Sequence, residues 1–417
     1  MGAKGLSSVY KSGAEAISAI PTGRRSIAFD SVIEELDLDP KKTPLIYLLE
    51  KVKKESVDQL VYNWYSESRR PDWIAPASTF FGGDWKAGAA ATGTIIVADA
   101  DAYLMYPSQI VRVPSVSALN IIITNAGSSG GGFTTFNAQT VSGSNINLSA
   151  ANASNLIYLI GDAFEIGSGM GTIITTQPTQ NYNYIQIVQT PIGITEEMTS
   201  IGMEVGGDEY ARQKKLAAIY HQLKLEKIAW FGERKLNATG VSITGVTGAG
   251  TYAQYFTGGV RSSITTNVTS SVGALDVDEF DTFVTEGARY ADQPVIFCGE
   301  LIAKGVRKWL KTDYTVNVNR TESVMGLSVM KYQTYDGKIV PIVPCPELFK
   351  EDLAGECYSL DMSDIKYKYL KGFDTRLELD LQENEVKQKI DEFRTYFGMK
   401  VGNEARHARM DGVTSIA

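Results

Sequence analysis

Two short segments of alternating apolar and polar residues stand out along the chain. In residues 59–66 the alternation places Leu60, Tyr62 and Trp64 on one face of a predicted strand. Residues 182–190 alternate in the same way. We predict that the two strands are the outgoing and returning parts of one long excursion of the chain.

The excursion contains a block, residues 87–195, that carries almost no charge. Arg112 is its only basic residue, and its acidic residues are Asp99, Asp101, Asp162 and Glu165. Residues 127–132 (GSSGGG) are predicted to form a flexible tip. Short strands separated by turns are predicted at 94–98, 109–113, 120–124, 145–148 and 156–160. The pattern indicates a small β-barrel or sandwich inserted into a hairpin, with a surface made to be covered by other chains.

The longest helical pattern follows, at residues 208–235. Its apolar residues recur in one stripe: Tyr210, Leu216, Ile219, Tyr220, Leu223 and Trp230. About 26 residues with a rise of about 1.5 Å each would make a rod of about 40 Å. Such a rod is longer than the core of a small domain needs, so we expect a scaffold axis. Arg212, Lys215 and Glu226 lie off the stripe.

The remaining periods predict a mixture of helices and strands. Residues 31–55 indicate a helix, with Thr43 as its N-cap and Pro44 in its first turn. A helix, a strand and a helix are predicted at 278–291, 294–298 and 300–310, which suggests an α/β unit. Further strands are predicted at 339–343, 358–360, 365–369, 377–381 and 387–401. The predicted fold class is therefore α+β.

Composition narrows the class of protein. The chain has 417 residues, 43% of them hydrophobic and 21% charged, which is typical of a globular protein. A net charge of −8 argues against binding to nucleic acid through overall basicity. Residues 1–30 do carry a basic excess, which is compatible with contact to nucleic acid and equally with a solvated arm. Three cysteines without a CxxC pair favour reduced thiols, and we expect no membrane span.

The residues that usually carry catalysis are scarce. The chain has two histidines, His221 inside the long helical pattern and His407 in the basic segment 406–409. We expect His221 to be packed or on the surface, and His407 to lie in a solvated or interface loop. No GxSxG or GxxxxGK[ST] pattern is present. The sequence therefore predicts no catalytic, cofactor-binding or metal-binding residues, no cofactor and no enzyme.

Several segments share their order and spacing with one known family. They are residues 38–45, 48–51, 62–64, 160–167, 183–186, 195–198, 226–232, 340–343 and 396–399. These segments resemble tailed-bacteriophage major capsid proteins of the Hong Kong 97-type fold, in the subfamily with a β insertion in the extended loop. The resemblance covers most of residues 31–417.

The resemblance implies a division of the chain into the four parts of that fold. The N-terminal arm would be residues 1–57, and the extended loop residues 58–195, with its inserted β domain at about 87–180. The peripheral domain would combine residues 196–237, which hold the spine helix, with strands in 351–390. The axial domain would combine residues 238–350 and 391–417.

The resemblance also implies self-assembly into hexamers and pentamers, and then into an icosahedral shell around double-stranded DNA. Aromatic anchors between subunits are expected at Tyr62, Trp64 and Trp73, with a role inside the chain left open for Trp64. Ion pairs across subunits are expected at Arg69, Arg70, Arg212, Lys215 and Glu226.

Further partners follow from the same resemblance: a portal, possible scaffolding or decoration proteins, and non-specific contacts with packaged DNA. The expected location is the virion, after assembly in the host cytoplasm. Because residues 87–195 contain no lysine, a crosslink borne by the loop would have to use Lys86, and we predict none. The alternatives are an encapsulin-like compartment, a β-rich tail or adhesin component and, third, an enzyme.

Overall fold

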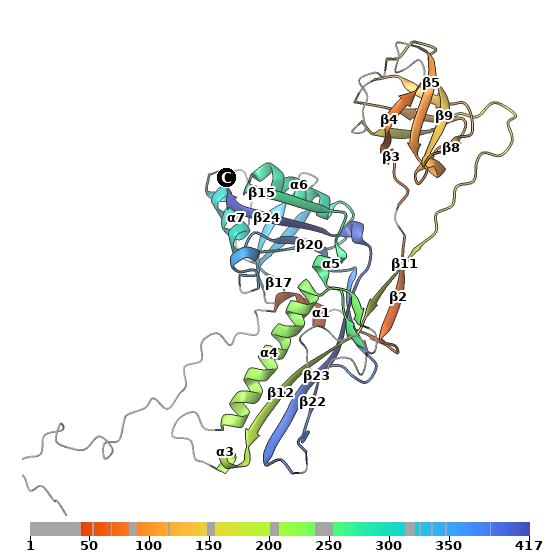
Figure 1. Cartoon of the computed structure of the whole chain (residues 1–417). Coiled ribbons are helices and arrows are strands. Elements are labelled where there is room, and N and C mark those ends of the chain that lie inside the picture. The colour runs from red at the N-terminus through yellow and green to blue at the C-terminus, as the bar shows by residue number, and fades with distance from the viewer. Residues whose placement is uncertain are drawn as a thin grey trace, which may run out of the picture. The chain divides into compact units, whose positions relative to one another are not determined.

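A computed structural model describes most of the chain after residue 42. The described residues are 43–51, 54–67, 69–82, 90–115, 117–147, 155–200, 208–237, 253–312, 322–324, 327–334, 337–346, 348–383 and 385–417. Most of the predicted arm, and Lys86, lie outside them. The chain forms two compact units (Figure 1). Unit 1 comprises Met1–Trp64 with Tyr182–Ala417, and unit 2 comprises Tyr65–Asn181.

Unit 2 is a small antiparallel barrel. Its main strands are β3 (Trp73–Ile74), β4 (Pro76–Gly82), β5 (Thr92–Ala98), β6 (Gln109–Arg112), β7 (Asn120–Ile123), β9 (Phe133–Thr140) and β10 (Ile157–Asp162). They pair in the order β3-β10-β6-β7-β9-β5-β4. Only Ala75 separates β3 from β4, so the two ends of the sheet meet and the sheet wraps around its core (Figure 1).

The barrel core consists of apolar side chains that alternate inward along the strands. Ile95 and Val97 from β5, Val111 from β6 and Ile121 from β7 are completely buried. Alternation between core and solvent is the sequence signature of such strands. It explains why four of the five predicted strands, those at 94–98, 109–113, 120–124 and 156–160, correspond to β5, β6, β7 and β10.

Two predictions for unit 2 are wrong in detail. The described part of the predicted strand 145–148, residues 145–147, forms no strand, because only Ile146 makes a bridge, to Ala90. The predicted tip contains β8 (Ser128–Gly130), which pairs with β9, a strand that the sequence analysis missed. Gly131 and Gly132 turn the chain between them with φ values of 68° and 87°, which favour glycine.

Unit 1 contains two sheets. The first, called here the α4 sheet, has the order β1 (Glu55–Val57), β21 (Ile365–Leu370), β23 (Gln388–Val401), β12 (Gln186–Thr195), and β22 (Arg376–Glu378) also pairs with β23. The second has the order β15 (Val268–Leu275), β24 (Ala408–Ile416), β20 (Cys357–Asp361), β16 (Pro294–Cys298), β19 (Ile339–Pro344), β18 (Leu327–Gln333), β17 (Glu322–Val324). Two further pairs are β2 (Val61–Ser66) with β11 (Thr179–Tyr184), and β13 (Lys235–Asn237) with β14 (Gln254–Phe256).

The helices of unit 1 pack beside these sheets (Figure 1). They are α1 (Pro44–Lys51), α3 (Glu196–Ser200), α4 (Glu209–Phe231), α5 (Val260–Ser263), α6 (Val277–Ala288) and α7 (Glu300–Thr312), with 3-10 turns at Ala102–Leu104 in unit 2 and Glu351–Leu353 and Glu404–Arg406 in unit 1. The predicted helix–strand–helix at 278–310 is confirmed as α6, β16 and α7. Among the described residues, no helix is long and apolar enough to cross a membrane.

Helix α4 is the predicted rod, but its buried face differs from the predicted stripe. Asp208 caps it by accepting hydrogen bonds from the N–H groups of Tyr210 and Ala211. The helix ends at Gly232, where a Cβ would lie 2.5 Å from the carbonyl oxygen of Thr257. Its buried residues are Ala217, His221, Leu225, Glu226, Ala229 and Trp230, whereas Tyr220 is exposed. Polar residues therefore occupy part of the inward face.

Candidate inter-subunit surfaces

The first half of α4 is attached to its sheet by buried polar side chains. The Tyr210 hydroxyl donates to the carboxylate of Asp391, which is fully buried. Farther along the helix, the ring of His221 lies between the hydroxyls of Thr190 and Thr395, at 3.0 and 2.7 Å. Burial, assisted by the charge of Lys224, lowers the pKa of His221 to about 4. The imidazole is therefore neutral near pH 7, as a packed residue.

Glu226 joins α4 to α1 and faces no solvent. Its carboxylate accepts hydrogen bonds from the N–H groups of Leu45 and Ile46, at 3.0 and 2.7 Å, and from the indole of Trp230 at 2.9 Å. Such a carboxylate satisfies donors that the first turn of a helix leaves open. Burial raises the pKa of Glu226 to about 7. The prediction of Glu226 in an ion pair across subunits is wrong, because the side chain is completely buried.

The two aromatic residues of β2 also bond within the chain. Tyr62 is 7% exposed, and its hydroxyl donates to the carbonyl oxygen of Met399 at 2.8 Å. It is therefore unavailable as an anchor for a second copy. Trp64, which is half-buried, donates to the carbonyl oxygen of Gly402 at 3.2 Å, so it has the role inside the chain that the sequence left open. A contact of its exposed part with a partner stays a prediction.

The other predicted contact residues are at least partly exposed. Arg69 pairs with Asp72 at 3.0 Å, and Arg70 donates to the carbonyl oxygen of Leu104. The exposed ring of Trp73 lies 4.6 Å from that of Tyr158, centroid to centroid.

On α4, Arg212 forms an ion pair with Glu209 at 2.6 Å, one turn away, and this pairing holds the pKa of Glu209 at about 2. Lys215 is exposed on the same helix. Contacts of the five residues Arg69, Arg70, Trp73, Arg212 and Lys215 with other copies stay predictions.

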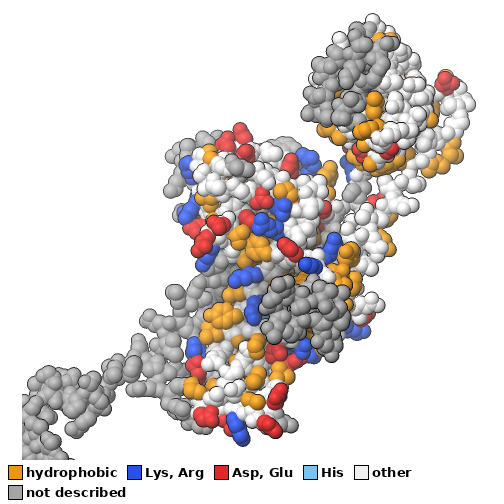
Figure 2. All heavy atoms as spheres, in the orientation of Figure 1, with side chains coloured by type: hydrophobic (Ala, Val, Ile, Leu, Met, Phe, Trp, Pro, Cys, Tyr) orange, Lys and Arg blue, Asp and Glu red, His pale blue; other side chains and the backbone are white. Residues whose placement is uncertain are grey.

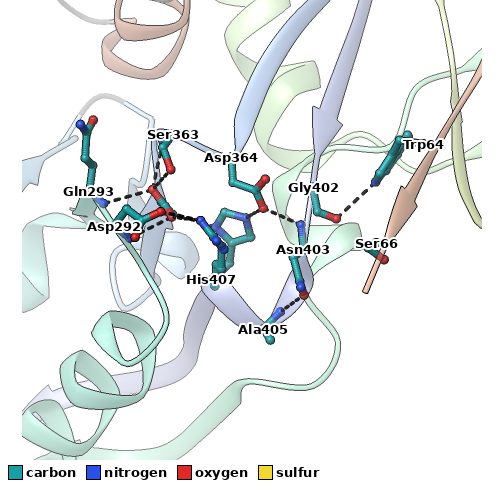
Figure 3. Close-up of polar contacts among 12 residues, drawn as sticks. Trp64, Ser66, Asp292, Gln293, Ser363, Asp364, Gly402, Asn403, Ala405 and His407 are labelled. Atoms are coloured by element: carbon teal, nitrogen blue, oxygen red, sulfur yellow. Dashed lines mark hydrogen bonds and ion pairs between the residues drawn. The ribbon is translucent and has the colours of Figure 1, made fainter. Parts of the chain in front are cut away.

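Two chain connections between the sheets of unit 1 meet at His407 (Figure 3). One connection, 361–365, joins β20 to β21, and the other, 401–408, joins β23 to β24. The backbone N–H of Asp361 donates to Nδ1 of His407 at 3.1 Å. This bond fixes the neutral tautomer, and burial lowers the pKa of His407 to about 4. His407 is fully buried, so the prediction of a solvated or interface loop is wrong.

Carboxylates complete this junction. Burial alone would raise the pKa of Asp361, but hydrogen bonds from Ser363 and from the backbone of Asp292 outweigh burial and lower this pKa. Arg406 pairs with both Asp292 and Asp361, at 2.8 and 3.2 Å. The junction could not be predicted from the sequence, because its members come from three distant segments. The polar groups of the junction bond to one another and so hold the two connections together. Within the described ranges, no group of three or more side chains is placed so that it could hold a metal ion.

Unit 2 carries an uncovered segment between β10 and β11. Residues 163–178 form no helix or strand and are nearly all exposed. Ile166, Met170 and Ile173 are 108%, 88% and 75% exposed, and Glu165 is the only charged residue of the segment. Large apolar side chains without a cover are typical of interaction surfaces. The molecule thus offers contact surfaces and no assembled catalytic site among its described residues.

The exposed apolar surfaces are suited to association with other chains. The model of one family, the SU10 major capsid protein, matches residues 28–414. The chain belongs to the SU10 major capsid protein family. No curated protein matches it.

Solved shell structures resemble the chain at low identity. The capsid of a native GTA particle is 9% identical, with 96% of this chain and 99% of that chain covered and a TM-score of 0.43. The SrpI encapsulin complex of Synechococcus elongatus is 14% identical, covers 57% of this chain and 77% of its own, and has a TM-score of 0.41. The capsid of cyanophage A-1(L) is 13% identical, with 58% of this chain and 83% of that chain covered and a TM-score of 0.37. All three TM-scores are below 0.5, and the assignment rests on the family.

Family membership confirms the central predictions. The protein is a major capsid protein, a structural component of a capsid that is built by self-association, and its family is not one of enzymes. The predicted fold class, α+β of the Hong Kong 97 capsid type, agrees with this membership. The tail, adhesin and enzyme alternatives have no such support, and the encapsulin alternative is weaker.

Proposed function

We propose that this chain forms the hexamers and pentamers of an icosahedral bacteriophage head that encloses double-stranded DNA. One observation carries the proposal beyond the family: the apolar segment 163–178 is uncovered in the single chain. Burial of such a segment between copies removes apolar surface from water without the large penalty of burying many charges. Weak contacts of this kind hold a shell together when many are made at once.

The proposed parts of the chain keep the boundaries that the resemblance implies. Residues 58–195 would form the extended loop, and unit 2 would be the body of its inserted domain. Helix α4 would be the spine helix of the peripheral domain, and strands β15 to β19 and β24 of the seven-stranded sheet would form the centre of the axial domain. The residues 1–57 would form the N-terminal arm.

The proposed partners are a portal, possible scaffolding or decoration proteins, and packaged DNA bound without sequence specificity. The basic excess of residues 1–30 supports the DNA contact. Assembly would take place in the host cytoplasm. With no lysine at 87–195, we propose that this region holds its neighbours by packing and backbone contacts, without a covalent link.

Negative-stain electron microscopy of the purified chain tests the proposal. We expect closed polyhedral particles, or sheets of hexamers and pentamers. A chain that remains monomeric at high concentration would overturn it. The ratio of nucleic-acid to protein absorbance is then measured for particles from infected cells and for empty particles treated with nuclease. A higher ratio in the first sample indicates a head filled with DNA, whereas equal ratios indicate a compartment that encloses protein.

A further inference from the structure

One face of the barrel in unit 2 carries a stripe of large apolar side chains. Leu156, Tyr158 and Ile160 alternate along and beside β10, and they are 43%, 37% and 46% exposed. Trp73 is the register partner of Tyr158 on β3, so the two rings share one face. These four residues are called here the β10 stripe.

The barrel does not need the β10 stripe for its own core. Ile157, which alternates with the stripe, is completely buried, and so is Val111 on the neighbouring strand. A β-bulge at Ile160 leaves that residue without a partner on β6 and keeps its side chain exposed. In Figure 2, hydrophobic side chains gather toward one end of unit 2, among surroundings with few charges. The stripe is therefore an exposed apolar surface that the barrel core does not require.

A second uncovered apolar surface follows within a few residues. The segment 163–178 exposes Phe164, Ile166, Met170 and Ile173, without regular structure of its own. One surface is held rigidly by the barrel, and the other is extended. Within one chain both remain exposed, so neither covers the other.

The charges beside the two surfaces are complementary. Arg112, the only basic residue of 87–195, is the register partner of Tyr158 on β6, so it flanks the stripe. Glu165, the only charge of the extended segment, stands between Phe164 and Ile166. A carboxylate that arrives with the segment would meet the positive charge of Arg112, a residue that is partly exposed beside the stripe.

We propose that the β10 stripe of one copy receives residues 164–173 of a neighbouring copy, with Glu165 facing Arg112. A second copy is the fitting occupant because the chain supplies both apolar halves and both charges, and because the family assembles from identical chains. The contact is heterologous, since different patches meet, and such contacts generate rings when the rotation closes. The proposal rests on the proposed shell function and names the surfaces that meet within it.

Cysteine crosslinking tests the contact in assembled particles. All three native cysteines are buried, so an introduced surface thiol reacts selectively. One chain carries Tyr158→Cys and the other, distinguished by a tag, carries Ile166→Cys, next to Glu165 and fully exposed in the single chain. The two are co-assembled, oxidised with a mild disulfide reagent and separated without reduction. We expect a heterodimer that contains one chain of each kind.

The matched control replaces Tyr158→Cys by Val141→Cys, which is on the same barrel and 56% exposed but outside the stripe. The heterodimer yield should fall several-fold with this control. Intact particles with equal yields for both pairs would overturn the contact while leaving the shell function standing. Absence of any particles from the unaltered chain would overturn the shell function and, with it, this contact.

A charge exchange gives a second measurement. Arg112→Glu and Glu165→Arg should each reduce the yield of particles several-fold, and the double variant should recover most of it. Failure of the double variant to recover, with each single variant folded by circular dichroism, would contradict the pairing of Glu165 with Arg112.

Discussion

The barrel of unit 2 and the helix α4 of unit 1 are stabilised in opposite ways. The barrel core is a closed set of apolar side chains. Helix α4 is instead joined to its sheet by directed hydrogen bonds, from Tyr210 to Asp391 of β23 and from His221 to threonines of β12 and β23. Among the described residues, the buried acids and histidines belong to unit 1; they are His221, Glu226, Glu356, Asp361, Asp391 and His407.

The difference separates stability from geometry. Apolar burial is non-directional and stabilises a domain by itself, whatever it is attached to. Buried polar contacts add little net stability, but they fail when a partner is displaced. We infer that unit 2 is built to survive insertion into a loop, and that the α4 interface is built to hold one arrangement.

The largest expected effect is in the barrel core. Phe136 lies on β9 and is 2% exposed. The substitution Phe136→Ala should lower the unfolding free energy by about 4 kcal/mol, because it leaves a cavity in the core. Hydrogen exchange measured by mass spectrometry should rise in β5 and β9 and stay unchanged in α4. Phe133→Ala, at a 40% exposed position of the same strand, is the control. Faster exchange throughout α4 would break the comparison.

Glu226→Ala should have the next largest effect and lower the unfolding free energy by about 3 kcal/mol, because it leaves three buried donors without an acceptor. Exchange should accelerate in α1 while the barrel stays protected. Glu226→Gln retains one acceptor oxygen and should lose less. Equal losses in the two variants would mean that the hydrogen bonds do not hold α1.

The buried histidine should make stability depend on pH. The pKa of His221 falls from 6.5 to about 4 on folding, so the unfolded chain takes up the proton first. Its contribution is complete above about pH 6.5 and is lost as the pH falls toward 4, by up to about 3 kcal/mol.

Denaturant unfolding of the native chain and of His221→Gln measures this contribution as the difference between the two curves. Using the difference matters because Glu226, with its pKa raised from 4.5 to about 7, acts in the opposite sense: its contribution declines as the pH rises between those values. A difference that stays constant from pH 7 to pH 4 would contradict the assignment to His221.

Arg69→Ala should have the smallest effect on folding, under about 0.5 kcal/mol, because its ion pair with Asp72 is exposed on both sides. The measurement is the unfolding free energy of the unassembled chain, beside the yield of particles. A fall in particle yield with unchanged stability would support the predicted contact of Arg69 between copies. Unchanged values of both would remove Arg69 from that surface.

The sequence predicted those elements whose apolar pattern is set by local burial. The strand 294–298 was found in place because it is apolar throughout and buried on both faces, with Ile296 and Cys298 in one core and Phe297 in another. The helices around it were found because each turns one apolar face to the core. The burial of Glu226 and His407 could not be predicted, because each is satisfied by partners 46 to 181 residues away. Strand β24 was missed for a related reason: a segment that begins with Arg406 and Arg409 has the composition of a surface tail until Asp361 and the neighbouring strands surround it.

The junction at His407 has a mechanical consequence. Both backbone connections, 361–365 and 401–408, pass through it side by side, linked by the bond from Asp361 to the imidazole. A force that pulls the two sheets apart is therefore shared by two backbone connections instead of acting on one. We infer that the doubled connection resists separation of the two sheets better than a single connection would.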